Sequence, residues 1–218
     1  NGLLALTTTA LILGTFGVLI RELAKSFSNA GQVFARSFFA LLIILVIVYF
    51  KKVQPFKIAK ENIKYIVGFS IVLPLSIIFF TTSANLIKVT NSLFMLYVGS
   101  LVSTAFIGKF LFKEKFSAKH VISLIVVFIG LCFFVDPFNL GSMSLGVGFG
   151  LLSGLFEGFS HTLRKLMKNI SREVIVFYQS VSGVVLATFL LLTSNEPMVT
   201  NLHPKAVVVA MAFGVLMI

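Results

Sequence analysis

Apolar residues follow one another in runs of about 17 to 25 along the chain, and short polar segments separate the runs. A helix rises about 1.5 Å per residue, so it needs about 20 apolar residues to cross a hydrocarbon core about 30 Å thick. In lipid a single helix satisfies all of its own backbone hydrogen bonds. The pattern predicts membrane helices at residues 3–20, 31–50, 64–83, 92–111, 120–135, 145–163, 174–193 and 205–218, the last of them incomplete.

Composition supports an integral membrane protein. Of the 218 residues, 58% are hydrophobic and only 11% are charged, and the mean hydropathy is +1.05. A water-soluble domain of this size cannot bury so much apolar surface in one core. The formal net charge is +11. The basic residues lie between the apolar runs and form no continuous basic face, so we expect no nucleic-acid partner. Cys132, the single cysteine, excludes a disulfide framework.

The distribution of Lys and Arg predicts the orientation of the helices. Basic residues are retained on the cytoplasmic side of short loops. Thirteen of them share one side: Lys51, Lys52, Lys57, Lys60, Lys64, Lys109, Lys113, Lys115, Lys119, Arg164, Lys165, Lys168 and Arg172. The opposite side has four: Arg21, Lys25, Lys88 and Lys205. We therefore expect the amino terminus in the cytoplasm.

The first two predicted helices recur in the sixth and seventh. A shift of 143 residues without a gap lays Phe16, Arg21, Phe34, Arg36 and Ser37 on Phe159, Arg164, Phe177, Gln179 and Ser180. Because five helices separate the two copies, the second copy crosses the membrane in the opposite direction. Inverted repeats of this kind form many secondary transporters, whose substrate site lies at the repeat interface near the middle of the bilayer.

Several short motifs, in their order and spacing, resemble the EamA-type transporters of the drug/metabolite transporter superfamily. They are Phe34-Ala35-Arg36-Ser37-Phe38, Ser83-Ala84-Asn85-Leu86-Ile87-Lys88-Val89-Thr90 and Phe112-Lys113-Glu114-Lys115. Two positions depart from the family pattern. Leu13-Gly14 stands where Trp-Gly is common, and Gly99-Ser100-Leu101 stands where a proline is frequent in the middle of the helix.

This resemblance implies an all-α polytopic protein of ten helices in two inverted five-helix repeats, of which about seven and a half are present here. Residues 1–135 would form the first repeat, 136–144 the loop between repeats, and 145–218 the start of the second. The implied function is secondary transport of a small organic metabolite, such as an amino acid, across a prokaryotic cytoplasmic membrane. Export by alternating access is favoured, with coupling to protons and substrate exchange both open, as is the oligomeric state.

One acidic residue, Glu157, lies deep inside a predicted span, whereas the other six acids lie at or beyond the helix ends. A charged carboxylate at mid-bilayer costs about 2.5 to 3.5 kcal/mol, so it normally marks a cavity, an ion path or a partner. Ser153, Glu157, His161 and Arg164 have helical spacing and form one polar stripe. We predict proton coupling for this carboxylate and its histidine. The alternative is a protonated acid bonded to a neighbouring helix, with the basic residues reaching the headgroups.

Beside the polar stripe, glycines recur at every fourth position. Gly146, Gly150, Gly154 and Gly158 form three overlapping small-xxx-small motifs. Small residues at this spacing allow another helix to approach closely. We predict that these glycines serve helix packing and turn Glu157 towards the interior.

Arg36 and its repeat mate Gln179 are further candidates for the substrate path, because polar side chains are rare within membrane spans. Arg36 either bonds carbonyls at the outer rim or touches an anionic group of the substrate. Tyr97, Ser100 and Thr81 offer hydroxyls for a substrate, although a hydroxyl also bonds readily to its own helix.

Enzyme motifs are absent from the sequence. The three histidines are His120, His161 and His203, and neither an HExxH motif nor a Walker A motif occurs. We therefore expect no catalytic residue, cofactor or metal site. The rival interpretation, a membrane-embedded enzyme or lipid-handling protein, would be favoured if the protein changed a lipid but moved no solute. A channel would show flux without saturation or coupling.

Overall fold

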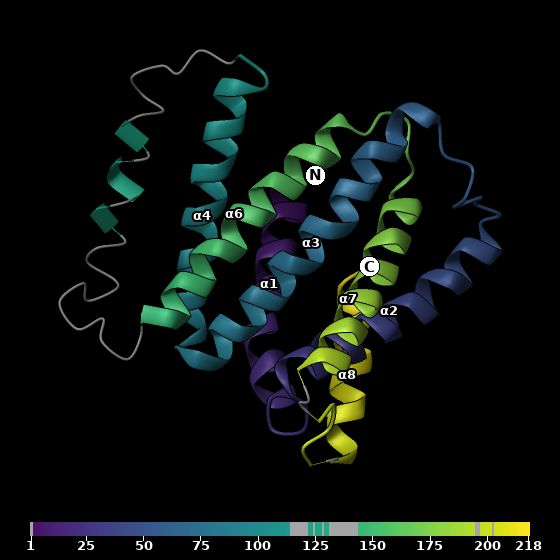
Figure 1. The fold of residues 1–218 in the computed structure, drawn as a ribbon, viewed down its shortest axis with the longest axis vertical. Coiled ribbons are helices and arrows are strands. Elements are labelled where there is room, and N and C mark those ends of the chain that lie inside the picture. Colours follow the sequence, from purple (N-terminus) through teal and green to yellow (C-terminus); the bar gives the residue numbers. More distant parts are fainter. Residues whose placement is uncertain are drawn as a thin grey trace. The chain divides into compact units, whose positions relative to one another are not determined.

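The fold is described by a computed structural model for residues 2–113, 122–123, 125–127, 129–130, 144–194, 197–201 and 203–218. These residues form α-helices joined by short connections, with one isolated β-bridge and no strand among them, which confirms the predicted all-α fold (Figure 1). The helices are α1 (Gly2–Leu23), α2 (Asn29–Phe50), α3 (Lys60–Leu86), α4 (Val89–Phe110), α6 (Ser144–Leu166), α7 (Arg172–Thr193) and α8 (Pro204–Leu216). The helix expected at 120–135 falls mostly outside the described residues.

The helices extend beyond the apolar windows from which they were predicted. The largest extension is in α3, a helix of 27 residues that begins four residues before the predicted span 64–83 and ends three after it. Lys60, Glu61 and Asn62 are polar, so hydropathy excluded them, yet they continue the helix beyond the apolar window. Pro74 lies inside α3 without ending it, as is tolerated in membrane helices.

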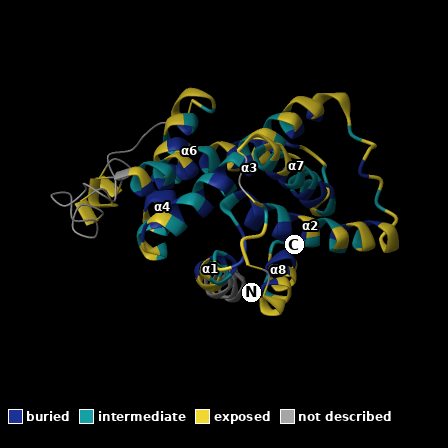
Figure 2. Cartoon of the chain, turned by 60° about the horizontal axis from the view of Figure 1, so that its bottom comes forward, coloured by how far each residue is buried: buried dark blue, intermediate teal, exposed yellow. Residues whose placement is uncertain are grey.

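By length and composition, α2, α3, α4 and α7 could each cross a membrane. Only 33–39% of each apolar window is buried within the described protein. Figure 2 shows exposed positions recurring along these helices. Helix α6 is also long enough, but its glycines and the polar residues Ser153, Glu157 and His161 lower its hydropathy.

The chain divides into two compact units. Unit 1 comprises Asn1–Ile58 and Ile170–Ile218, with α1, α2, α7 and α8. Unit 2 comprises Ala59–Asn169, with α3, α4 and α6. Each unit therefore combines helices from both predicted repeats.

In unit 1, α2 and α7 pack side by side in opposite directions. At one end, Lys51 Nζ after α2 lies 2.6 Å from Glu173 Oε1 at the start of α7. At the other end, the Ser28 amide before α2 donates to the Met198 carbonyl after α7 over 3.3 Å. Ile44, Val48, Val176 and Phe177 form a buried apolar cluster in this pair.

The antiparallel pair agrees with the predicted inverted repeat. Shifting both bounds of α2 by 143 residues gives both bounds of α7, Arg172 and Thr193. The same shift takes the end of α1, Leu23, to the end of α6, Leu166. The predicted repeat mates α2 and α7 run in opposite directions, as an inverted repeat requires, and the inversion of the whole second copy stays a prediction.

In unit 2, α6 lies against both α3 and α4 (Figure 1). The ring of Phe79 on α3 stacks on Phe149 and Phe156 of α6, with ring centroids 5.8 and 5.7 Å apart. At one end of the unit, Ser83 Oγ near the end of α3 donates to the Gly146 carbonyl at the start of α6 over 2.7 Å. This end of the unit therefore holds two segments: the connection from α3 to α4, and the start of α6.

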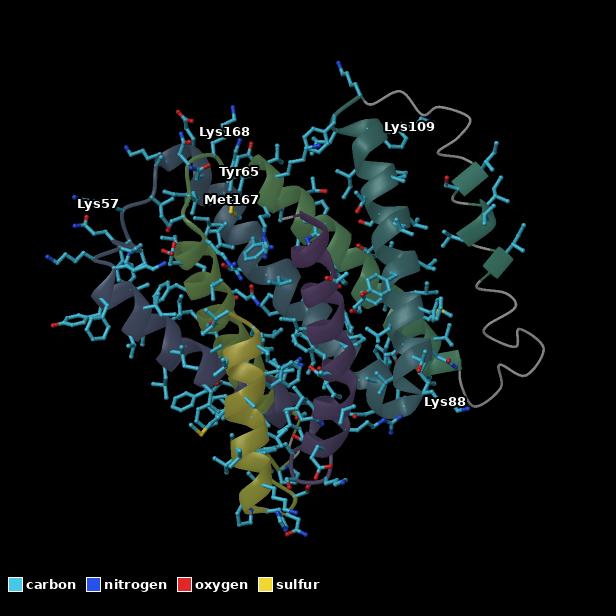
Figure 3. The ribbon with its side chains drawn as sticks, turned by 180° about the vertical axis from the view of Figure 1, so that it is seen from behind. Lys57, Tyr65, Lys88, Lys109, Met167 and Lys168 are labelled. Atoms are coloured by element: carbon cyan, nitrogen blue, oxygen red, sulfur yellow. The ribbon has the colours of Figure 1, made fainter. Side chains whose placement is uncertain are left out.

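At the other end of unit 2, the start of α3 meets the segment after α6. Asn62 Nδ2 donates to the Lys168 carbonyl over 2.9 Å, and the Lys168 amide donates to Asn62 Oδ1 over 3.3 Å. Figure 3 shows Lys168 and Lys109 at this end, with Lys88 at the opposite one. Connections that the charge pattern assigned to one side of the membrane thus lie together within the unit. Which side is cytoplasmic stays a prediction.

Candidate transport site

Glu157 lies on the side of α6 between its contacts with α3 and with α4. Ser153, one turn earlier, contacts α3, and Gly154 contacts α4. Successive helical residues are about 100° apart, so Glu157 projects about 40° from Ser153 and about 60° from Gly154. Its direction falls between the two neighbouring helices.

The nearest basic group to Glu157 on its own helix is His161. His161 Nε2 lies 3.6 Å from Glu157 Oε1, and the two side chains are 53% and 27% exposed. Tyr97 of α4, a further candidate, is about half exposed. An acid and an imidazole thus lie one helical turn apart on α6, and both groups can exchange protons or hydrogen bonds.

Ser153 is fully buried and holds α6 to α3. Its Oγ donates to the Ser76 carbonyl over 2.9 Å, and Ser76 Oγ donates to the Ser153 carbonyl over 2.9 Å. The two hydroxyls lie 3.3 Å apart. The Ser153 hydroxyl is therefore engaged in helix packing. At the cytoplasmic end predicted for the stripe, the Arg164 guanidinium lies over the Phe69 ring of α3, 5.5 Å from its centroid.

The four glycines predicted to serve packing lie against neighbouring helices. A Cβ on Gly146 would approach Ile87 Cγ2 to 2.5 Å, and one on Gly150 would approach Met95 Cβ to 2.6 Å. A Cβ on Gly154 would overlap the Leu96 carbonyl and lie 2.8 Å from Gly99 Cα.

The fourth glycine, Gly158, extends this close approach towards Glu157. A Cβ at this position would lie 2.6 Å from the Ser100 carbonyl. Ser100 thus contributes its backbone to the crossing of α4 and α6. In contrast, Gly148 on the same helix has no neighbour within 4 Å of a Cβ. The tight spacing is therefore specific to the face of α6 that carries the four glycines.

Thr81, Arg36 and Gln179 have other surroundings. Thr81 is buried and its hydroxyl donates to the Ile77 carbonyl of its own helix over 2.7 Å. In unit 1, Arg36 is 3% exposed, and its guanidinium lies over the Phe213 ring of α8 at 4.9 Å. Gln179 is half-buried on α7. Arg36 thus packs inside the unit.

Sequence reasoning missed Ser76 and Asn62, which join distant segments through hydrogen bonds. Neither residue belongs to a local motif, and their partners Ser153 and Lys168 are 77 and 106 positions away. A polar residue inside an apolar span was the only available signal for Ser76. Among the described residues, no group of three or more His, Cys, Asp or Glu side chains is arranged to hold a metal ion.

Comparison with known proteins agrees with this architecture. The model of the EamA-like transporter family matches residues 1–135, more than half of the chain. No curated protein matches the sequence. The helices, the antiparallel repeat mates and this match together show that the chain is a multi-pass membrane protein that belongs to the EamA-like transporter family.

Proposed function

We propose that this protein is a secondary active transporter that exports a small organic metabolite, such as an amino acid, with Glu157 as the group that carries the coupling proton. Membership of a transporter family supports transport itself. The observation that carries the finer proposal is the place of Glu157 in the middle of α6, beside His161.

The cost of an ionised acid in lipid supports a role for Glu157 beyond packing. Such a group costs about 2.5 to 3.5 kcal/mol at the centre of a helix in a bilayer. Its neighbour Ser153 already ties α6 to α3, and the glycines already provide the contact with α4. Helix packing therefore does not require the Glu157 carboxylate. Binding and release of a proton, in contrast, require an ionisable group such as this one.

The inverted repeat supports alternating access. Two copies of one fold in opposite orientations can exchange conformations, which gives an inward-facing and an outward-facing state of similar energy around one site. A proton on Glu157 in one state and its release in the other would couple solute movement to the proton gradient.

The proposal is tested with the full-length protein in proteoliposomes. A panel of labelled metabolites is offered with and without an imposed pH gradient. We expect at least one solute to accumulate against its concentration gradient only when the pH gradient is present, with saturating kinetics. Accumulation driven only by a preloaded second solute would identify an exchanger. It would also rule out coupling of transport to the proton gradient. Non-saturating flux would identify a channel, and a chemically changed lipid without solute movement would identify a lipid enzyme.

A further inference from the structure

The end of unit 2 that holds Asn62 and Lys168 is strongly basic. Seven exposed basic residues lie at this end, and we name them the basic rim: Lys60, Lys64, Lys109, Lys113, Arg164, Lys165 and Lys168. Glu61 is the one acidic residue among the described residues 59–69, 105–113 and 161–169. At the opposite end, Lys88 is the one charged residue within 81–95 and 144–149. The positive charge of the unit is therefore concentrated at one end.

The corner of the rim where α4 and α6 end brings basic and aromatic side chains together. Lys165 Nζ of α6 lies 4.4 Å from the centroid of the Phe112 ring, which follows α4. Lys109 Nζ, within the last turn of α4, lies 5.8 Å from the Phe110 ring. Ammonium groups from the ends of two helices thus lie over aromatic rings.

Directly below this corner, α4 presents apolar side chains to its surroundings. Phe106, Phe110 and Leu111 are 63%, 64% and 56% exposed. The rings of Phe106 and Phe110 pack with centroids 4.4 Å apart. An exposed apolar strip that leads to a cluster of cations matches the two parts of a phospholipid, an acyl chain and an anionic headgroup.

We propose that the corner formed by Lys109, Lys113 and Lys165 binds an anionic phospholipid. The lysines hold the phosphate of the headgroup, and Phe106, Phe110 and Leu111 contact its acyl chain. Clusters of basic residues just beyond membrane helices attract anionic lipids near the membrane surface. A free phosphate ion would use only the lysines and leave the apolar strip without a partner.

Native mass spectrometry of the full-length protein in detergent tests this site. The protein is titrated with phosphatidylglycerol and, separately, with phosphatidylcholine. We expect wild-type protein to bind phosphatidylglycerol more tightly, and Lys109→Gln with Lys165→Gln to weaken that binding about tenfold. Phosphatidylcholine binding should not change, and a higher salt concentration should reduce the preference for the anionic lipid.

The matched control removes two lysines elsewhere. Lys88→Gln with Lys205→Gln makes the same change in net charge, at the opposite end of unit 2 and at the start of α8. It should leave phosphatidylglycerol binding within about twofold of wild type. Lys109→Arg with Lys165→Arg keeps the charge and should keep the binding. Equal binding by the two glutamine variants, or equal binding of the two lipids by wild type, would overturn the proposal.

Discussion

Gly154 shows at the level of one residue how α6 reaches its position. Any side chain here would overlap the Leu96 carbonyl of α4, and a backbone carbonyl inside a helix cannot move aside cheaply. The glycine spacing predicted close packing from the sequence, whereas the identity of the partner helix came only from the structure. The contact of Arg36 with the Phe213 ring likewise came only from the structure, because no local sequence pattern indicates it.

Gly154→Ala tests this close approach. We expect the substitution to lower the free energy of unfolding by about 2 kcal/mol, because an added methyl group forces α4 and α6 apart. Thermal unfolding in detergent measures the change. Gly148→Ala is the matched control, since a Cβ there meets open space, and it should be neutral or slightly stabilising through helix propensity. Equal melting temperatures for the two variants would contradict the close contact.

Glu22 gives a prediction for pH. A hydrogen bond from Lys25, over 2.5 Å, holds the pKa of this exposed carboxyl below its ordinary value of 4.5, with Lys205 and His203 adding to the effect. Because the pKa is lowered in the folded protein, the stability from this pair is present above pH 4.5. It is lost as the pH falls through the lowered pKa.

Lys25→Gln should therefore raise the pKa of Glu22 towards 4.5. A carboxyl-carbon NMR titration of selectively labelled protein measures the shift. Lys57→Gln removes the same charge from the exposed segment after α2, where no interaction with Glu22 occurs. It should leave the titration unchanged. A Glu22 titration that is the same in wild type and Lys25→Gln would exclude Lys25 as the cause.

At the scale of elements, the helices followed directly from hydropathy, whereas their ends and their tertiary ties did not. The span 31–50 became α2 with its end unchanged, because Lys51 ends both the apolar run and the helix. In α3, polar residues prolong the helix, so an apolar window cannot mark its start. Asn62 then joins that start to the segment after α6, a contact between residues 106 positions apart.

Asn62→Ala tests this tie between α3 and the segment after α6. The Lys168 amide donates to Asn62 Oδ1, so its loss should speed hydrogen exchange at Lys168 about fivefold to tenfold, in line with about 1 kcal/mol for one hydrogen bond. Mass spectrometry of peptides that cover residues 164–170 measures this rate of hydrogen exchange. Asn62→Asp keeps the acceptor oxygen and should keep most of the protection. Unchanged exchange in the alanine variant would show that this bond does not hold the segment.

At the scale of the whole molecule, the repeat was visible in the sequence as a shift of 143 residues, and the antiparallel packing of α2 and α7 gives it a physical meaning. The composition of the compact units was not predictable from that shift. Unit 1 joins α2 to α7 and α1 to α8, and unit 2 joins α3 and α4 to α6. Helices from the two repeats thus pack on one another, because contacts form between faces that match in shape, whatever their order along the chain.

The orientation of the molecule is tested by cysteine labelling. In a Cys132→Ala background, Lys57→Cys and Lys88→Cys place single thiols at exposed positions on opposite predicted sides. An impermeant maleimide added to intact cells should label Lys88→Cys alone, since the charge pattern places Lys57 in the cytoplasm. Inside-out vesicles should reverse the result. Labelling of Lys57→Cys in intact cells would invert the predicted topology.

The central claim is that Glu157 carries the proton that drives transport. Its most direct test uses Glu157→Gln in proteoliposomes and measures accumulation of the solute that the metabolite screen identifies as the substrate. Glutamine keeps the size of the side chain and its hydrogen bonding but cannot bind or release a proton near neutral pH. We predict that this variant equilibrates its substrate yet no longer accumulates it in response to a pH gradient, whereas Glu157→Asp retains part of the response. Accumulation by Glu157→Gln that equals wild type, with the same dependence on pH, would contradict the account.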